Sequence, residues 1–147
     1  MLGDLRVRLS INVVALFLCE GRGLFLHHLA PPEPDRWDLP GGGLEPAEDL
    51  ITGLRRTVHA GIGLTDFTVD RLLTVAEAFY PEGQGRQVHK LDLVYTCQAD
   101  PQPLTFDTFD TQTIGPMGIC WIPVANLLPE TCTSRAWKAL QASQQGA

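Results

Sequence analysis

Residues 37–64 read WDLPGGGLEPAEDLITGLRRTVHAGIGL, and this stretch joins three consecutive glycines to an amphipathic segment. Glycine tolerates positive φ angles and lets a ligand approach the main chain closely, so we interpret Gly41–Gly43 as a loop. The pattern that follows predicts a helix over residues 46–60, stopped by Gly61 and Gly63. A glycine loop at a helix N-terminus directs amide hydrogens and the positive end of the helix dipole toward an anion, which suits a phosphate.

The predicted helix has two chemically different faces. Apolar residues recur at helical spacing and are expected to face a core: Ala47, Ile51, Leu54 and Val58. The remaining positions are polar and are expected to face solvent or a ligand: Glu48, Thr52, Arg55, Arg56 and Thr57. A helix with this division packs on a sheet or on another helix.

Six spaced positions in this stretch resemble the Nudix box, Gly-x5-Glu-x7-Arg-Glu-U-x-Glu-Glu-x-Gly-U, in which U is apolar. They are Gly42, Glu48, Arg56, Val58, Gly63 and Leu64. The preceding Trp-Asp-Leu-Pro-Gly-Gly resembles the usual lead-in, and residues 91–95 and 120–123 resemble later segments of the family. The resemblance covers nearly the whole chain, so it implies an α/β/α sandwich with a mixed β-sheet over residues 1–147 as one domain.

The same resemblance implies a reaction and a cofactor. Family members direct water at a pyrophosphate bond in a nucleoside diphosphate linked to another group, with Mg²⁺ or Mn²⁺ on the phosphate oxygens. Transferred to this chain, the resemblance implies retained catalytic positions at Glu48 and Arg56, and a substrate-binding surface formed by Gly41, Gly42, Gly43 and Arg56.

The chain departs from the box at three positions that normally carry glutamates. Thr57, Ala60 and Gly61 stand there instead, so the hard oxygen ligands of the usual metal site are missing apart from one hydroxyl. Glu45 and Glu48 are the nearest remaining candidates for metal ligands. More distant candidates are His59, Glu77, Glu82 and Asp92. Alternatively, Glu48 and Arg56 form an ion pair that fixes the loop to the helix.

Composition limits the range of partners and compartments. A chain of 147 residues suits a single domain that buries about 68–70% of its unfolded surface. A net charge of −6 argues against a nucleic-acid polymer, although a small phosphorylated ligand is compatible with a few arginines. Cys19, Cys97, Cys120 and Cys132 have no zinc spacing, so we expect free thiols in a cytoplasmic protein. The apolar run from residue 11 to residue 19 is too short to span a membrane, which takes about 20 residues.

The remaining segments alternate between strand and turn patterns. Strands are predicted over residues 6–19, 24–26, 69–80, 87–98 and 117–122. Residues 100–116 are expected to form a long loop, residues 123–128 a turn or short helix, and residues 133–143 a C-terminal helix. His27 and His28 end the second strand, and alternation allows at most one of them to face a ligand cleft.

Three functions remain open at this point. The chain is a Nudix-type protein that binds a nucleoside-diphosphate-linked or related phosphorylated small molecule, with metal-dependent hydrolysis weak or lost. Alternatively, it is an active hydrolase whose metal ligands have moved to Glu45, Glu48 and strand acids. The third alternative is a regulatory or interaction module, for which a homodimer is left open.

Overall fold

The computed structural model describes residues 6–100 and 114–145. The seven strands of the sheet are β1 (Arg6–Cys19), β2 (Arg22–His28), β3 (Arg36–Asp38), β4 (Gly41–Gly43), β5 (Thr68–Gly83), β6 (Arg86–Gln98) and β7 (Ile114–Pro123). The helices are α1 (Leu50–Ile62) and α2 (Ser134–Gln145), preceded by the short 3₁₀ turns Val124–Asn126 and Pro129–Thr131. None of these helices is long and apolar enough to cross a membrane.

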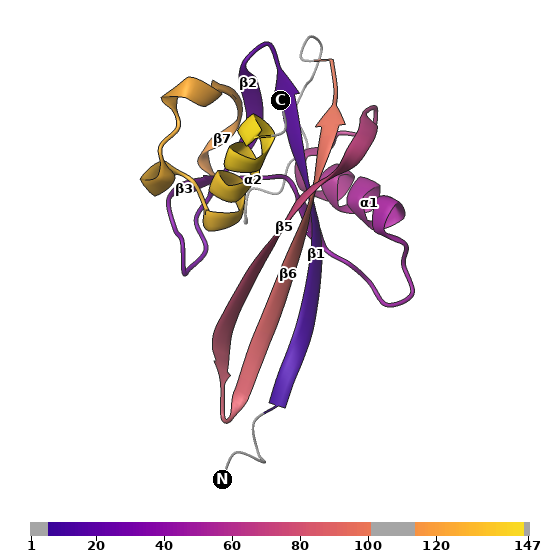
Figure 1. Ribbon diagram of the computed structural model, residues 1–147, viewed down its shortest axis with the longest axis vertical. Helices are drawn as coiled ribbons and strands as arrows, with labels where there is room; N and C mark the ends of the chain where they lie inside the picture. The colour runs from indigo at the N-terminus through magenta and orange to yellow at the C-terminus, as the bar shows by residue number, and fades with distance from the viewer. Residues whose placement is uncertain (1–5, 101–113, 146–147) are drawn as a thin grey trace.

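The sheet is mixed and is organised around β1, which the sequence marks by its long apolar run. β1 runs parallel to β6 along most of its length, and β5 lies antiparallel to β6 at one edge of the sheet. The end of β1 forms the predicted hairpin with β2, which in turn pairs with β3 and β7. The short strand β4 lies antiparallel to the middle of β1. Figure 1 shows this order, with α1 and α2 on different sides of the sheet.

Alternation along β1 supplies both layers of the core. Val13, Ala15 and Phe17 point to the cluster beneath α1, whereas Val14 and Leu16 point to the cluster beneath α2. All five side chains are fully buried, which explains why this part of the sequence is continuously apolar instead of alternating. Because each helix covers one face, the predicted α/β/α sandwich is confirmed.

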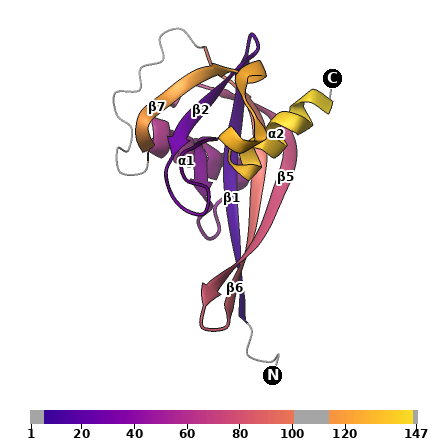
Figure 2. The same cartoon turned by 90° about the vertical axis from the view of Figure 1, so that its left-hand side faces the viewer.

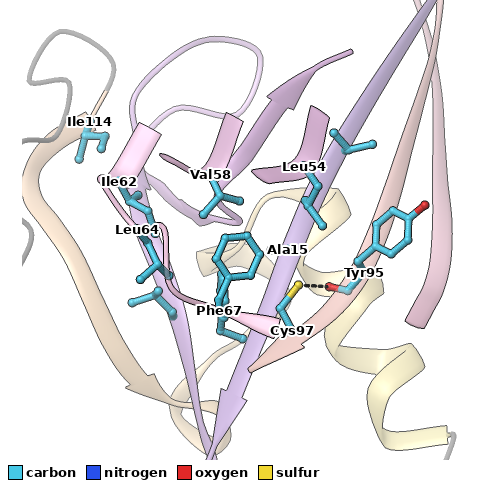
Figure 3. Close-up of a cluster of buried hydrophobic side chains, with 12 residues drawn as sticks. Ala15, Leu54, Val58, Ile62, Leu64, Phe67, Tyr95, Cys97 and Ile114 are labelled. Atoms are coloured by element: carbon cyan, nitrogen blue, oxygen red, sulfur yellow. Dashed lines mark hydrogen bonds between the residues drawn. The ribbon is translucent and has the colours of Figure 1, made fainter. Parts of the chain in front are cut away.

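The cluster beneath α1 shows how the helix is held on the sheet. Leu54, Val58 and Ile62 recur along one side of α1 and are fully buried. Figure 3 shows them facing side chains of the sheet and of the segment that follows the helix. Phe67, from that segment, packs edge-on against Phe17 with 5.3 Å between the ring centroids. Truncating a buried leucine of this kind to alanine typically costs about 2–5 kcal/mol.

The predicted helix over residues 46–60 begins and ends too early, because α1 continues through Gly61 to Ile62 and is stopped by Gly63 alone. Ala47 has a φ of +63°, and Asp49 is extended and caps the helix by accepting a hydrogen bond from Thr52 N at 2.9 Å, so α1 starts at Leu50. Ala47 is therefore not on the apolar face, and Ile51 is exposed. Thr57, predicted to be on the polar face, is buried.

Two loop predictions are also wrong in part. Gly41–Gly43 is the strand β4, because its backbone pairs with β1. The last strand begins at Ile114, so residues 114–116 of the predicted loop belong to β7, while residues 101–113 of that loop lie outside the described residues. β5 is longer than predicted at both ends and continues to Gly83.

Beyond the two helices, three strands continue as a projecting ribbon. It consists of residues 6–11 of β1, 77–83 of β5 and 86–91 of β6, closed by a turn at Gln84 and Gly85. Figures 1 and 2 both show this ribbon extending away from the helices. The sequence pattern does not predict this ribbon, because it shows where strands run but not which parts of them the helices cover.

Candidate functional site

The glycine strand is built for close contact between backbones. Gly41 has a φ of +141°, and a Cβ atom at this position would lie against the carbonyl oxygen of Val13. A Cβ at Gly42 would lie 3.4 Å from the methyl group of Thr57, so β4 also packs closely on α1. Glycine at these positions therefore allows β4 to fit between β1 and α1. Binding of a phosphate by these glycines stays a prediction.

Glu48 and Arg56 form the ion pair that one reading of the sequence predicts. Arg56 Nε donates to Glu48 Oε2 at 2.7 Å, and Arg56 Nη2 donates to Glu48 Oε1 at 2.9 Å. Arg56 Nη2 also donates to the carbonyl oxygen of Gly43 at 2.9 Å. The two residues are two helical turns apart in sequence, but Glu48 precedes the helix, so the chain can fold back toward Arg56. The pair thus fixes the segment between β4 and α1 on the helix.

This arrangement sets the charge of Glu48. Hydrogen bonds from Arg56, followed by one from the backbone amide of Glu45, lower the pKa of Glu48 to about 2. In return, the hydrogen bond with Glu48 raises the pKa of Arg56. Glu48 is therefore a carboxylate at neutral pH, and both of its oxygens accept hydrogen bonds.

The donor set around this pair does not fit a divalent metal ion. Glu45 is the other candidate ligand, and its carboxylate lies 3.8 Å from Arg56 Nη1, so both acids face a guanidinium. The Thr57 hydroxyl donates to the carbonyl oxygens of Gly53 and Leu54 within its own helix. Over residues 6–100 and 114–145, no three metal-ligating side chains converge. A metal ion on Glu48 would have to displace the cation already bonded there.

The more distant metal-ligand candidates are engaged elsewhere. Glu77 bonds His89 at 2.6 Å, and Glu82 bonds Arg8 at 2.8 Å, both on the projecting ribbon. His59 bonds the hydroxyl of Thr65 at 2.9 Å. Asp92 is buried beneath α2, on the opposite face of the sheet from α1. The structure therefore does not bring these residues to Glu45 and Glu48.

A cavity of about 580 Å³ lies on the α2 side of the sheet. Its lining combines strand residues with the start of α2 and with the proline-rich segment before β3: His28, Pro31, Pro32, Glu33, Arg36, Asp38, Ala76, Glu77, Ala78, Phe79, Tyr80, Lys90, Asp92, Thr133, Ser134 and Arg135. No residue of β4 or α1 lines it. His28 faces the cavity, whereas His27 is buried and bonds Asp35 at 2.6 Å, as expected from alternation.

The polar part of this lining is organised by one half-buried arginine, Arg135, whose side chain is 16% exposed. Arg135 donates through Nε and Nη2 to the two oxygens of Asp38, at 2.9 and 2.8 Å, and through Nη1 to Asp92 at 3.0 Å. The hydroxyl of Thr133 also donates to Asp38, at 2.8 Å. Arg135 thereby joins β3, β6 and α2, three elements that are far apart in the sequence.

The charges in this network are stabilised against burial. Burial of Asp38 by itself raises its pKa, but the charge and hydrogen bonds of Arg135, together with hydrogen bonds from Thr133 and the Leu39 amide, lower the pKa overall. Burial likewise opposes the charge of Arg135, yet Asp38 and Asp92 raise its pKa. Asp38 and Arg135 are therefore charged at neutral pH, and the arginine donates hydrogen bonds to both acids.

Sequence reasoning missed this cavity and its arginine. Asp38 is separated from Arg135 by 97 positions, and no local spacing connects them. The only available signals were Asp38 in the segment before the glycines and Asp92 in a strand that is otherwise apolar. A buried acid in a strand requires a cation nearby, but the pattern does not identify which one.

The cavity and the glycine strand are close together. Asp38 lies three residues before Gly41, so the two are at most about 11 Å apart. In the sheet, Asn12 is paired with Gly43 on one side and with Asp92 on the other, which is a separation of about 10 Å between the outer strands. A ligand of nucleotide size is long enough to reach both places.

Comparison with known proteins places this architecture in a family. A family model of the NUDIX domain matches residues 8–142. A search of curated protein sequences gave no match. The crystal structure of the MutT NUDIX hydrolase from Burkholderia pseudomallei is similar, with a TM-score of 0.72, 21% identity and coverage of 92% of this chain and 98% of that one.

Two other solved structures have the same fold at lower identity. A NUDIX hydrolase from Nitrosomonas europaea has a TM-score of 0.69 and 17% identity, over 95% of this chain and 90% of its own. The NUDIX domain of Shewanella oneidensis NrtR, complexed with ADP ribose, has a TM-score of 0.64 and 14% identity, over 94% of this chain and 86% of its own. With the family model matching most of its length, the chain belongs to the NUDIX domain family.

Proposed function

We propose that this NUDIX domain binds a nucleoside-diphosphate-linked or related phosphorylated small molecule, and that ordinary metal-dependent hydrolysis is weak or lost. The observation that carries the proposal is the Glu48–Arg56 ion pair. Glu48 is the one acid of the box that this chain retains, and both of its oxygens accept hydrogen bonds from Arg56, while positions 57, 60 and 61 supply no carboxylate. Loss of a general base typically costs a factor of about 10²–10⁴ in rate.

The cavity beneath α2 is the place that we assign to the ligand. It combines an aromatic wall at Tyr80 with polar groups from Lys90, Arg36 and the start of α2. A heterocycle against Tyr80 leaves the phosphates beside Lys90, Arg36 and the start of α2, which line the same cavity. A volume of about 580 Å³ is within the usual range of about 300–1,000 Å³ for small-molecule sites.

Calorimetric titration tests the binding part of this proposal. ADP-ribose is the first probe, because the NUDIX domain of Shewanella oneidensis NrtR was crystallised with it, followed by a nucleoside diphosphate sugar and by free ADP. We expect binding without Mg²⁺ and little change when Mg²⁺ is added. No binding of any of these probes at any accessible concentration would remove the proposal.

A matched pair of variants tests the location. Tyr80→Ala removes the aromatic wall, and we expect a rise in the dissociation constant of about 5- to 150-fold, as for loss of one aromatic stacking contact worth about 1–3 kcal/mol. Leu72→Ala is the control, because Leu72 is exposed on the same strand and does not line the cavity. Equal affinities for the two variants would place the ligand elsewhere.

A gain-of-function variant tests the hydrolysis part. Ala60 is exposed, and a Cβ at Gly61 would meet no atom within 4 Å, so Ala60→Glu with Gly61→Glu can be accommodated on α1. We expect this double variant to bind Mn²⁺ more tightly than the parent chain does. Unchanged Mn²⁺ affinity would show that the absent acids are not what limits metal binding.

A further inference from the structure

The projecting ribbon has one face that nothing in the described chain covers. Side chains alternate along a strand, so Val7 and Leu9 lie on the same face as Val13, which packs beneath α1. The strand register places Phe79, His89 and Leu9 side by side in one row on this face. In both views α1 ends before these rows begin (Figures 1 and 2). We call this the open face.

The other face of the ribbon is covered by its own side chains. Val88 is fully buried although it lies on the ribbon, because Tyr80 and Arg8 are its neighbours on the two adjacent strands. Arg8 is fixed across this face by a hydrogen bond of 2.8 Å to Glu82. The two faces of the ribbon therefore differ in structure as well as in composition, because side chains of the ribbon itself shield the backbone only on this second face.

The open face is unusually apolar for a surface. Val7, Leu9 and Phe79 are 56%, 55% and 56% exposed, and Val75 continues the face toward the helices. Single exposed apolar side chains are common, but these four lie on one face of three paired strands. Leu9 and Phe79 share a row, Val7 lies in the next row toward the tip, and Val75 lies two rows nearer the helices. Contiguous patches of this kind mark interaction surfaces.

The charges on the open face favour a second copy of the chain. Its central polar groups are Glu77 and His89, joined by one hydrogen bond of 2.6 Å between Glu77 Oε2 and His89 Nε2. Within the described residues, Glu77 Oε1 and His89 Nδ1 have no hydrogen-bond partner. In a twofold interface each residue meets the other protomer's equivalent surface, so the acid of one copy can face the imidazole of the other.

Other occupants fit less well. The arginines at the ribbon tip, Arg6 and Arg86, belong to the rows of the covered face, so they do not offer an anionic membrane a charged approach to the open face. A net charge of −6 further disfavours such a surface. Pairing through the edge of β5 is obstructed at Val75, whose carbonyl oxygen accepts a hydrogen bond of 2.7 Å from Lys138.

We infer that two copies of this chain pack the open faces of their ribbons together about a twofold axis. Leu9 and Phe79 form the apolar centre of this interface, and Glu77 of each copy bonds His89 of the other. Glu77 and Phe79 of β5 also border the cavity, but the homodimer rests on the open face and does not require a ligand in the cavity.

Sedimentation velocity of the full chain over a range of concentrations tests this inference. The parent chain is expected to dimerise, and Leu9→Glu with Phe79→Glu is expected to weaken dimerisation at least about tenfold. Met117→Glu is the matched control, because Met117 is also 56% exposed but lies on β7. Circular dichroism and thermal melting establish that each variant is folded.

A charge exchange tests the polar centre. His89→Glu alone opposes like charges across the twofold axis and should weaken the dimer, whereas adding Glu77→His restores the complementary pair and should restore the dimer. A parent chain that stays monomeric at its highest soluble concentration would overturn the inference, as would a dimer indifferent to Leu9→Glu and Phe79→Glu. A monomer that sediments with anionic vesicles would assign the face to a lipid surface and equally refute it.

Discussion

Arg135→Met is the substitution that most sharply tests the buried network beneath α2. Methionine has a similar length, so the change removes the charge and three hydrogen bonds while leaving most of the packing volume. Asp38 and Asp92 then remain buried without the cation that they share. Breaking a buried ion pair by removing one partner typically costs about 3–5 kcal/mol, and we expect the free energy of unfolding at neutral pH to fall by that amount.

The pH dependence of this loss follows from the pKa of Asp38. In the parent chain that pKa is lowered, so the stabilisation from Asp38 is present above its unfolded pKa of about 3.9 and is lost as the pH falls through the folded value. Without Arg135, burial dominates and raises the pKa of Asp38, so the folded variant takes up a proton more readily than the unfolded chain. The difference in stability between parent and variant should therefore shrink as the pH is lowered.

Urea denaturation at several pH values measures this difference, with the slope m compared to confirm that the unfolded states are alike. Arg71→Met is the control, because Arg71 is exposed on β5 and lies outside this network. We expect its free energy of unfolding to change by no more than about 0.5 kcal/mol. A loss below about 1 kcal/mol for Arg135→Met, the size of a surface pair, would refute the network as a structural element.

Three further outcomes are expected. Gly41→Ala should lower the free energy of unfolding by more than about 1 kcal/mol, because φ is +141° and the new Cβ meets the Val13 carbonyl; Gly61→Ala, at open space, is the control, and equal melting temperatures would contradict this. Glu48→Gln should make the melting temperature depend less on pH in acid. In the parent chain, the stabilisation from the Glu48 carboxylate is lost as the pH falls from 4.5 to about 2. An unchanged pH profile would show that the ion pair with Arg56 contributes nothing to stability. Cys97 should resist a thiol reagent at pH 8 until the chain unfolds, because burial raises its pKa to about 12. Cys19 is only partly buried, so mass spectrometry should find it labelled earlier. Simultaneous labelling of the two thiols would contradict the packing of Cys97.

The sequence predicted the framework of this fold for identifiable reasons. A continuous apolar run can occupy only a strand covered on both faces, and β1 fulfils that expectation with Val13 and Val14 in different core clusters. The spacing of Leu54 and Val58 likewise predicted the buried side of α1. The box spacing also indicated that Glu48 and Arg56 could meet, since the segment before the helix can bend.

The features that the sequence did not predict also have physical causes. Three glycines carry no side-chain pattern, so nothing distinguishes a loop from a strand such as β4 whose pairing is purely backbone. Ala47 is a good helix former, yet it lies at a positive φ in a turn closed by a hydrogen bond from Glu48 N to the carbonyl oxygen of Glu45. The cavity was invisible because its lining comes from six parts of the chain, and Arg135 was identified only when the fold placed it against Asp38 and Asp92.

We propose above that this NUDIX domain keeps its ligand site while its box no longer supports the usual hydrolysis. The most direct measurement is product release from ADP-ribose by the parent chain, in Mg²⁺ or Mn²⁺ and in EDTA, with heat-treated protein as the blank. We predict no metal-dependent product above the blank under conditions in which calorimetry shows the ligand bound. Metal-dependent release at about 1 s⁻¹ or faster, within the ordinary range of enzymes, that disappears in Glu48→Gln would contradict the claim.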